Sequence, residues 1–241
     1  MLKTMIPIRT SNEAVDRPGY LEVDTVVHCG RSMSGSFCRP VTYTDLICEW
    51  TVLRAEWDKS AAAVAEQTQD VEGKLPFALP GFDLDNGSEF INQHLADDLL
   101  KRKRPVCFTR SRPYRKNDNA HAEQKNWTHV RELPGYDRLE DPALVGELNT
   151  LYADWEKLNN FFKPVMKLTG KERVGSRYVK TCDVPATPYE RLTASGILTP
   201  EKSKALKKEY NTLDPFELNR RIEKQLRRIE ELKKQAEKTA A

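Results

Sequence analysis

The chain has 241 residues, of which 39% are hydrophobic, enough for one substantial domain with an extension. It has no apolar run near the roughly 18 residues of a membrane span, and its N-terminus lacks a signal-peptide core, so we expect a soluble cytoplasmic protein without a membrane partner. The net charge of +3 indicates no partner, but residues 101–116 carry eight basic side chains and no acidic one.

The cysteines argue against two further classes of protein. They are odd in number and never form a C-x-x-C pair, which speaks against a disulfide framework and a zinc ribbon. The five are Cys29, Cys38, Cys48, Cys107 and Cys182.

In the first 130 residues, three successive predicted strands are followed by alternating helices and strands. Residues 20–28, 37–45 and 47–55 are β-branched and aromatic runs, which predict an antiparallel meander. We then expect a helix capped by Asp58, a strand within 76–85, a helix from Ser88, a strand at 105–109 and a helix from about Asp118. This order indicates an α/β fold in which a mixed sheet carries helices on its faces.

The C-terminal third is predicted to be helical at both ends. Asp141 and Pro142 open a helix that runs to Phe162 with one apolar stripe. The polar segment 163–199 is interpreted as an irregular basic connector. From Asp214 a helix with a narrow apolar seam follows, for which coiled-coil pairing and packing on the core are both open.

Three acidic residues are candidate metal ligands. Asp24 lies in a predicted strand, where a buried charge is costly unless it is paired or binds metal. Asp85 ends the fourth predicted strand, where ligands of α/β sheets commonly bind, although its Asp-Asn-Gly context is also a plain turn signal. Glu123 lies in the helix after the basic segment. Converging carboxylates suit Mg²⁺, and two ions about 4 Å apart can catalyse phosphodiester displacement.

The helix around Glu123 also suggests a nucleic-acid surface. Asn119, Asn126 and Trp127 share its face, and Lys125 extends the basic segment. The simpler alternative is a solvated surface, with the KRKR run at 101–104 only ending a helix.

These residues together resemble a known family. The elements YLEVDTV, LPGFDLDNGSEF, FTRSRPYRKNDNAHAEQKNW and VRELPGYDR resemble the catalytic core of DDE-type transposases and integrases, the retroviral-integrase superfamily, as found in bacterial insertion sequences. The resemblance covers residues 19–165 and implies a ribonuclease-H-like fold with Asp24, Asp85 and Glu123 as catalytic and metal-binding residues. It implies that Asp83 is not a ligand and that Glu89 is structural or near DNA. Expected DNA contacts are Arg110, Arg112, Lys116, Asn119, Lys125 and Asn126.

The resemblance implies divalent-metal-dependent cleavage of transposon ends and transfer of the freed 3′-hydroxyls to target DNA, with two Mg²⁺ or Mn²⁺ ions. It also implies a homo-oligomer in a synaptic complex in the bacterial cytoplasm. Two alternatives stay open: a truncated, catalytically silent DNA-binding or oligomerisation module, and a ribonuclease-H-like nuclease. The four histidines (His28, His94, His121 and His129) offer a weaker alternative as bases or zinc ligands.

The expected organisation is a lead segment (1–18), the catalytic core (19–165), a basic connector (166–197) and a helical tail (198–241). The lead is too short for the helix-turn-helix region usual in such families, so we expect that region to be encoded separately or lost.

Overall fold

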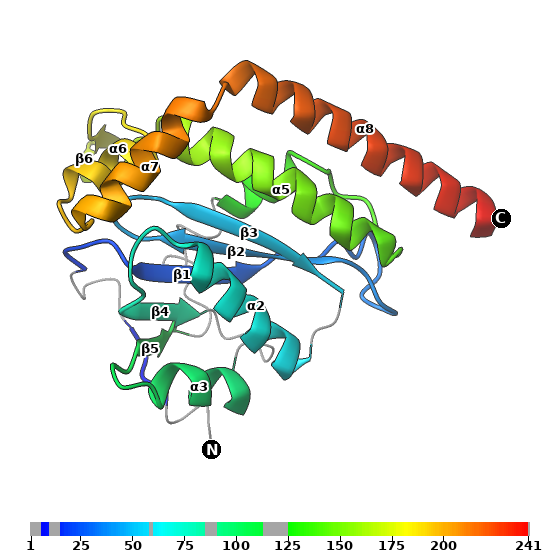
Figure 1. The fold of residues 1–241 in the computed structure, drawn as a ribbon, viewed down its shortest axis with the longest axis horizontal. Coiled ribbons are helices and arrows are strands. Elements are labelled where there is room, and N and C mark those ends of the chain that lie inside the picture. The colour runs from blue at the N-terminus through cyan, green and yellow to red at the C-terminus, as the bar shows by residue number, and fades with distance from the viewer. Residues whose placement is uncertain (1–5, 10–14, 58–59, 85–90, 113–124, 241) are drawn as a thin grey trace.

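A mixed five-stranded sheet forms the centre of the protein (Figure 1). The structure, a computed structural model, describes residues 6–9, 15–57, 60–84, 91–112 and 125–240. The strand order is β3-β2-β1-β4-β5. The strands are β1 (Tyr20–Thr25), β2 (Arg39–Asp45), β3 (Thr51–Glu56), β4 (Gly81–Leu84) and β5 (Cys107–Arg110). The first three pair antiparallel, whereas β4 runs parallel to both β1 and β5, which confirms the predicted α/β class with a mixed sheet.

Helices cover both faces of this sheet. Because successive side chains of a strand point to opposite faces, β3 contributes to two separate cores. Val52 belongs to the core under α2 (Ala61–Lys74) and α3 (Gln93–Leu100). Leu53 and Ala55 belong to the core under α5 (Ala143–Phe162), which also contains Val130 of the π-helix η2 (Asn126–Arg131). Figure 1 shows α5 running alongside β3 with α8 (Pro215–Ala240) outside it.

Polar side chains of α5 cover the outer edge of β3. An exposed strand edge presents unpaired backbone groups and invites pairing with other chains. Here three of its amides donate to α5: Thr51 N–H to Asn160 Oδ1 (3.0 Å), Leu53 N–H to Glu156 Oε1 (2.6 Å) and Ala55 N–H to Asn149 Oδ1 (2.9 Å). The sheet edge is therefore closed by side chains.

Several predicted boundaries shift because of local capping. The third strand begins at Thr51, not at residue 47, because the Asp45 carboxylate accepts from the amides of Ile47 (2.9 Å) and Cys48 (2.7 Å) and holds a turn there. Helix α2 is capped by Ser60; Asp58, the predicted cap, lies outside the described residues. Helix α3 begins at Gln93 under an Asn92 cap, and the predicted start at Ser88 also lies outside them.

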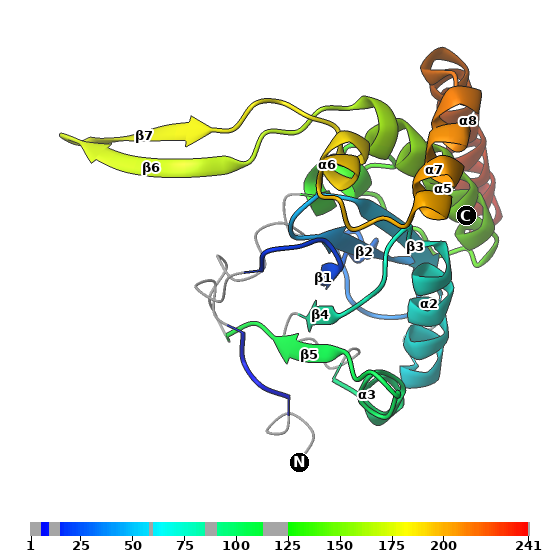
Figure 2. The same ribbon diagram turned by 60° about the vertical axis from the view of Figure 1, so that its left-hand side comes forward.

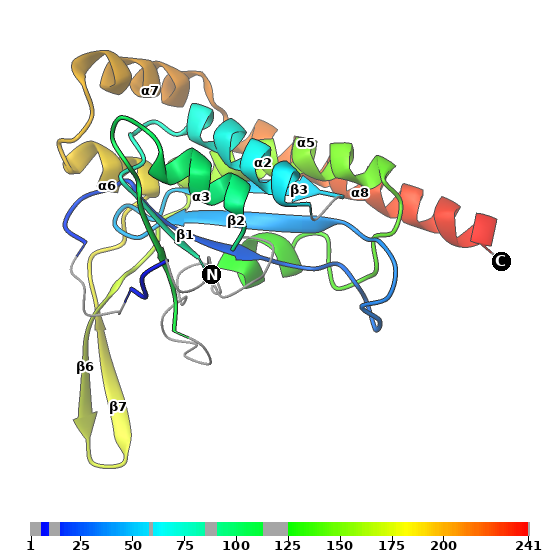
Figure 3. The same cartoon turned by 90° about the horizontal axis from the view of Figure 1, so that it is seen from below.

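The prediction of an irregular connector at 163–199 is wrong. The segment holds a two-stranded antiparallel hairpin, β6 (Leu168–Val174) with β7 (Arg177–Cys182), followed by α6 (Pro188–Ala194). The hairpin projects away from the body of the protein (Figures 2 and 3). Gly175 in its turn has φ 63°, a conformation that glycine adopts without strain.

The C-terminal tail is two helices, α7 (Pro200–Thr212) and α8. Helix α8 packs lengthwise on α5 and buries Leu218, Ile222 and Ile229 in the shared core (Figure 1). Of the two alternatives for its apolar seam, the structure has packing on the core. Among the described residues, none of the helices is both long and apolar enough to cross a bilayer.

Candidate active site at the carboxyl end of β1

Only part of the predicted triad lies within the described residues. Asp24 is the fifth residue of β1, and β1 pairs in parallel with β4 so that Val23 lies opposite Leu84. The carboxyl ends of these two strands therefore lie side by side. Asp85, Glu123, Lys116 and Asn119, as well as Glu89, lie outside the described residues.

Asn126 contacts Asp24 across 102 residues of sequence. Its Nδ2 donates to Asp24 Oδ2 at 2.6 Å, and the backbone amide of Thr25 donates to Asp24 Oδ1 at 2.9 Å. The partly buried carboxylate is thus held in one orientation by two donors. This contact fixes the beginning of η2 against the end of β1, so the Asn126 amide serves Asp24 in addition to its predicted use at DNA.

Asp83 has a structural position. Its side chain is 5% exposed, Oδ2 lies 2.7 Å from Arg9 Nη2, and Oδ1 accepts a hydrogen bond from the Thr109 hydroxyl at 2.5 Å. Glu22, directly opposite Asp83 in the β1–β4 register, lies 3.7 Å from the same Arg9. Arg9 therefore pairs with buried acids of the sheet, which gives Asp83 a structural contact.

Lys125 does not have the position expected of a DNA contact. Its side chain is 7% exposed and its Nζ lies 3.4 Å from Glu49 Oε2 in the turn between β2 and β3. Burial lowers the pKa of Lys125, and the neighbouring Glu49 acts in the opposite direction. Because the ammonium is buried and paired, we withdraw Lys125 from the predicted DNA contacts. Its role in the described structure is to hold the beginning of η2 to the sheet.

The two arginines of β5 and its continuation are partly buried. Arg110 pairs through its backbone with the N-terminal segment, since its amide donates to Pro7 O at 3.0 Å, and its Nε donates to Ile6 O at 3.2 Å. Arg112 follows two residues later at the boundary of the described segment.

An aromatic pocket adjoins Asp24. Trp127 and Tyr136 are 53% and 54% exposed, and their rings meet nearly edge to face with centroids 5.9 Å apart. Arg131 lies over the Tyr136 ring at 5.0 Å, and the Trp127 indole N–H donates to Glu132 at 2.8 Å. Trp127, Arg131 and Tyr136 line an open pocket of about 310 Å³ together with Thr25 and Asn126. Sequence reasoning missed Tyr136 and did not list Arg131 or Trp127 among the site residues.

Two of the four histidines are buried. His28 and His129 are buried, and His129 Nδ1 accepts from the Trp155 indole at 3.1 Å, so both belong to the core. Burial lowers the pKa of His28 to about 4. His94 is exposed, and His121 lies outside the described residues. Among the described residues there is no group of three or more His, Cys, Asp or Glu that could hold a metal ion.

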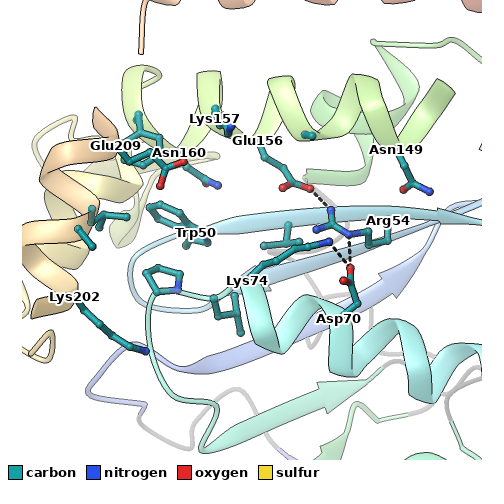
Figure 4. A pocket seen from close by; sticks show the side chains of 17 residues that line it. Trp50, Arg54, Asp70, Lys74, Asn149, Glu156, Lys157, Asn160, Lys202 and Glu209 are labelled. Atoms are coloured by element: carbon teal, nitrogen blue, oxygen red, sulfur yellow. Dashed lines mark hydrogen bonds and ion pairs between the residues drawn. The ribbon is translucent and has the colours of Figure 1, made fainter. Parts of the chain in front are cut away.

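A larger cavity lies elsewhere, between β3, α2, α5 and α7 (Figure 4). It has a volume of about 740 Å³, and four of its charged groups pair with one another. Arg54 lies between Glu156 (2.8 Å) and Asp70 (3.1 Å), and Lys74 adds a second cation at 2.6 Å from Asp70. Asn149 and Asn160, which also line the cavity, bond to the edge of β3, so we interpret this part of the cavity as scaffold.

No family model matches the sequence. The chain is 38% identical over 191 residues to the uncharacterized protein y4rM of Sinorhizobium fredii, a match that covers 79% of this chain and 54% of that protein. The chain thus spans about half the length of this curated relative.

Among solved structures, the chain is similar to one in the cryo-EM structure of the simian T-cell lymphotropic virus intasome in complex with PP2A regulatory subunit B56 gamma. The TM-score is 0.43 at 13% identity, and the match covers 53% of this chain and 42% of that one. Similarity at this level assigns neither a fold nor a function.

Proposed function

We propose that the chain is the catalytic core of a transposase or integrase, a divalent-metal-dependent enzyme that cleaves DNA and transfers the freed strand. The observation that carries this proposal is the 2.6 Å hydrogen bond from Asn126 to Asp24. It joins β1 to a segment that begins three residues after Glu123 in the sequence. This hydrogen bond connects Asp24 to a residue close to Glu123 in the sequence, which supports the joint site that the motif suggested.

The topology supports the finer proposal of a ribonuclease-H-like core. Three consecutive antiparallel strands are followed by two parallel ones on the other side of β1, as expected from the resemblance. In this arrangement Asp24 and Leu84 sit at neighbouring strand ends, and Asp85 is the residue after Leu84 in the sequence. Ligands of such sheets bind at the carboxyl ends of strands, which is where the proposal places the chemistry.

The three carboxylates of the proposed site are the type of ligand that a hard divalent cation prefers. Asp24 would hold it together with Asp85 and Glu123, since Mg²⁺ and Mn²⁺ prefer carboxylate oxygens. When bound, two such ions neutralise charge on the phosphodiester and lower the pKa of the attacking water or hydroxyl. Asn126 acts as a positioning residue, because its amide fixes the orientation of the Asp24 carboxylate.

The surface beside Asp24 suits a nucleic acid. Aromatic rings on which bases stack and nearby cations are the recurring features of sites for unpaired DNA. Trp127, Tyr136 and Arg131 supply both within the pocket that Asn126 also lines. A strand end with an unstacked base is therefore the substrate that the pocket favours.

The test separates Asp24 from Asp83, two acids of adjacent strands with different environments. Purified wild type, Asp24→Asn, Asp85→Asn and Asp83→Asn would be assayed for nicking and strand transfer on supercoiled plasmid with Mn²⁺, and for stability by urea unfolding. We expect Asp24→Asn and Asp85→Asn to lose activity and keep their stability. Asp83→Asn should lose stability, because Arg9 loses a buried partner, and keep its activity below the unfolding transition.

Two outcomes would replace the proposal. DNA binding without any cleavage by wild type under Mg²⁺ or Mn²⁺ would favour the silent binding module. Metal-dependent nicking that depends on Asp24, with no strand transfer from precut ends, would favour a ribonuclease-H-like nuclease.

A further inference from the structure

The β6–β7 hairpin has one basic face. Residues directly opposite in an antiparallel pair share a face, as do residues two apart along a strand. Lys171 pairs with Lys180, and Arg173 with Tyr178, so these four side chains lie on the same face. Glu172, the hairpin's single acid, pairs with Val179 on the other face. All of these residues are exposed.

This face is costly for the protein on its own. Like charges directly opposite each other destabilise a sheet, and an isolated two-stranded hairpin is marginally stable in water. The Lys171 ammonium lies over the Tyr178 ring at 4.5 Å. Within the described part of the chain, Lys171, Arg173 and Lys180 have no carboxylate within ion-pair distance. A face of three cations and a tyrosine therefore has the chemistry of a polyanion site.

The base of the hairpin is firmly attached to the sheet. Lys167 Nζ donates to the carbonyls of Leu46 (2.7 Å) and Ile47 (3.0 Å) at the end of β2. Its backbone amide donates to Asp183 Oδ1 at 2.7 Å, and Asp183 in turn pairs with Arg191 of α6 at 2.6 Å. A hairpin that is fixed at its base and exposed along its length can hold a bound molecule in a defined position relative to the core, unlike a loose loop.

We propose that the β6–β7 hairpin is a DNA-binding arm whose basic face lies against the phosphates of duplex DNA outside the active site. The inference rests on the proposed function for the identity of the polyanion. A two-stranded ribbon also matches the major groove, which is about 12 Å wide. Contacts with phosphates position a protein without reading sequence, so the arm holds the duplex in register with the site at β1.

The test is a salt titration of DNA affinity with the full-length protein, in the absence of divalent metal. The arm variant carries Lys171→Gln, Arg173→Gln and Lys180→Gln. The control variant carries the same change of charge on exposed lysines of α7: Lys204→Gln, Lys207→Gln and Lys208→Gln. The probe is a 30-base-pair duplex of arbitrary sequence, followed by fluorescence anisotropy.

If the arm contacts phosphates, the slope of log Kd against log salt falls by about 2.7 in the arm variant, since each contact contributes about 0.9. At 0.15 M salt this corresponds to an affinity loss on the order of a hundredfold. The α7 control should change far less. Arg173→Gln should weaken binding more than Arg177→Gln, which alters an arginine of the other face.

An arm variant whose slope and affinity match those of the α7 control would overturn the inference. So would a change of oligomeric state in sedimentation with an unchanged slope, because the arm would then bind a second copy of the chain. Plasmid nicking by wild type is measured separately. A reduced slope without nicking keeps the arm and removes the proposed enzyme, whereas nicking with an unchanged slope does the reverse.

Discussion

Polar groups along β3 and around the carboxyl end of β1 are arranged in opposite ways. Along β3, side chains of α5 accept hydrogen bonds from backbone amides, and Glu156 pairs with Arg54. These polar groups therefore find their partners within the protein. At the end of β1, Asn126 holds Asp24 from one side, while Trp127 and Tyr136 keep about half of their surface in solvent. One region uses polarity to complete the fold, and the other leaves aromatic and charged groups at the surface, where a ligand can reach them.

The first test removes a cation from a second closed group, in which Arg9 pairs with buried acids of β1 and β4. Arg9→Met leaves the carboxylates of Asp83 and Glu22, which are 5% and 1% exposed, without their shared cation. We expect a loss of about 3 to 5 kcal/mol in the free energy of unfolding, the usual result of breaking a buried pair. Urea unfolding would measure it.

The control for this change is Arg228→Met, which removes an exposed pair with Glu147 and should cost less than about 1 kcal/mol. Equal losses in the two variants would show that the acids beside Arg9 are well solvated and that Asp83 is not a structural residue.

A second test uses the pH dependence of stability. Burial raises the pKa of Glu156 from 4.5 to about 7, while Arg54 and the Leu53 amide act in the opposite direction. The folded state then keeps a proton that the unfolded chain releases, so this residue's contribution to stability is complete below pH 4.5 and is lost as pH rises through 7. The loss is at most about 3 kcal/mol.

Comparing wild type with Glu156→Gln in urea at several pH values isolates this contribution. The opposite dependence from His28, whose pKa is lowered to about 4, is common to both proteins and cancels. A wild-type stability that rises relative to the variant between pH 4.5 and 7 would mean that Arg54 outweighs burial.

The closed region was easier to predict from sequence than the open one. Alternating and helical periods depend on neighbouring residues, and they located all five strands of the sheet. The hairpin had a local signal as well, Gly175-Ser176 between β-branched runs, and Thr187 with Glu190 forms a capping box at α6 that the prediction overlooked. By contrast, the pairing of Lys125 with Glu49 joins distant parts of the chain, so a basic residue in a basic segment gave no hint of burial.

A third test removes one of the amides that close the edge of β3. Asn160 is buried, accepts from the Thr51 amide and donates to the Thr51 carbonyl at 2.8 Å. Asn160→Ala leaves both backbone groups unsatisfied, which should cost about 1 to 3 kcal/mol. Thermal unfolding against Asn219→Ala, an exposed asparagine of α8, measures the difference. An unchanged stability would mean that water replaces the side chain and that α5 does not protect this edge.

The smallest effect on stability is expected at the open region. Trp127 is 53% exposed, so Trp127→Ala should change the free energy of unfolding by less than about 0.5 kcal/mol. Its effect on binding should be larger, about 1 to 3 kcal/mol for a strand end with an unpaired base, because stacking on the indole is lost. Trp127→Phe should restore much of it. Phe216→Ala, an exposed aromatic of α8, is the matched control. If Trp127→Ala instead unfolds the protein while leaving affinity unchanged, the ring belongs to the scaffold, and the contrast between the two regions fails at the pocket beside Asp24.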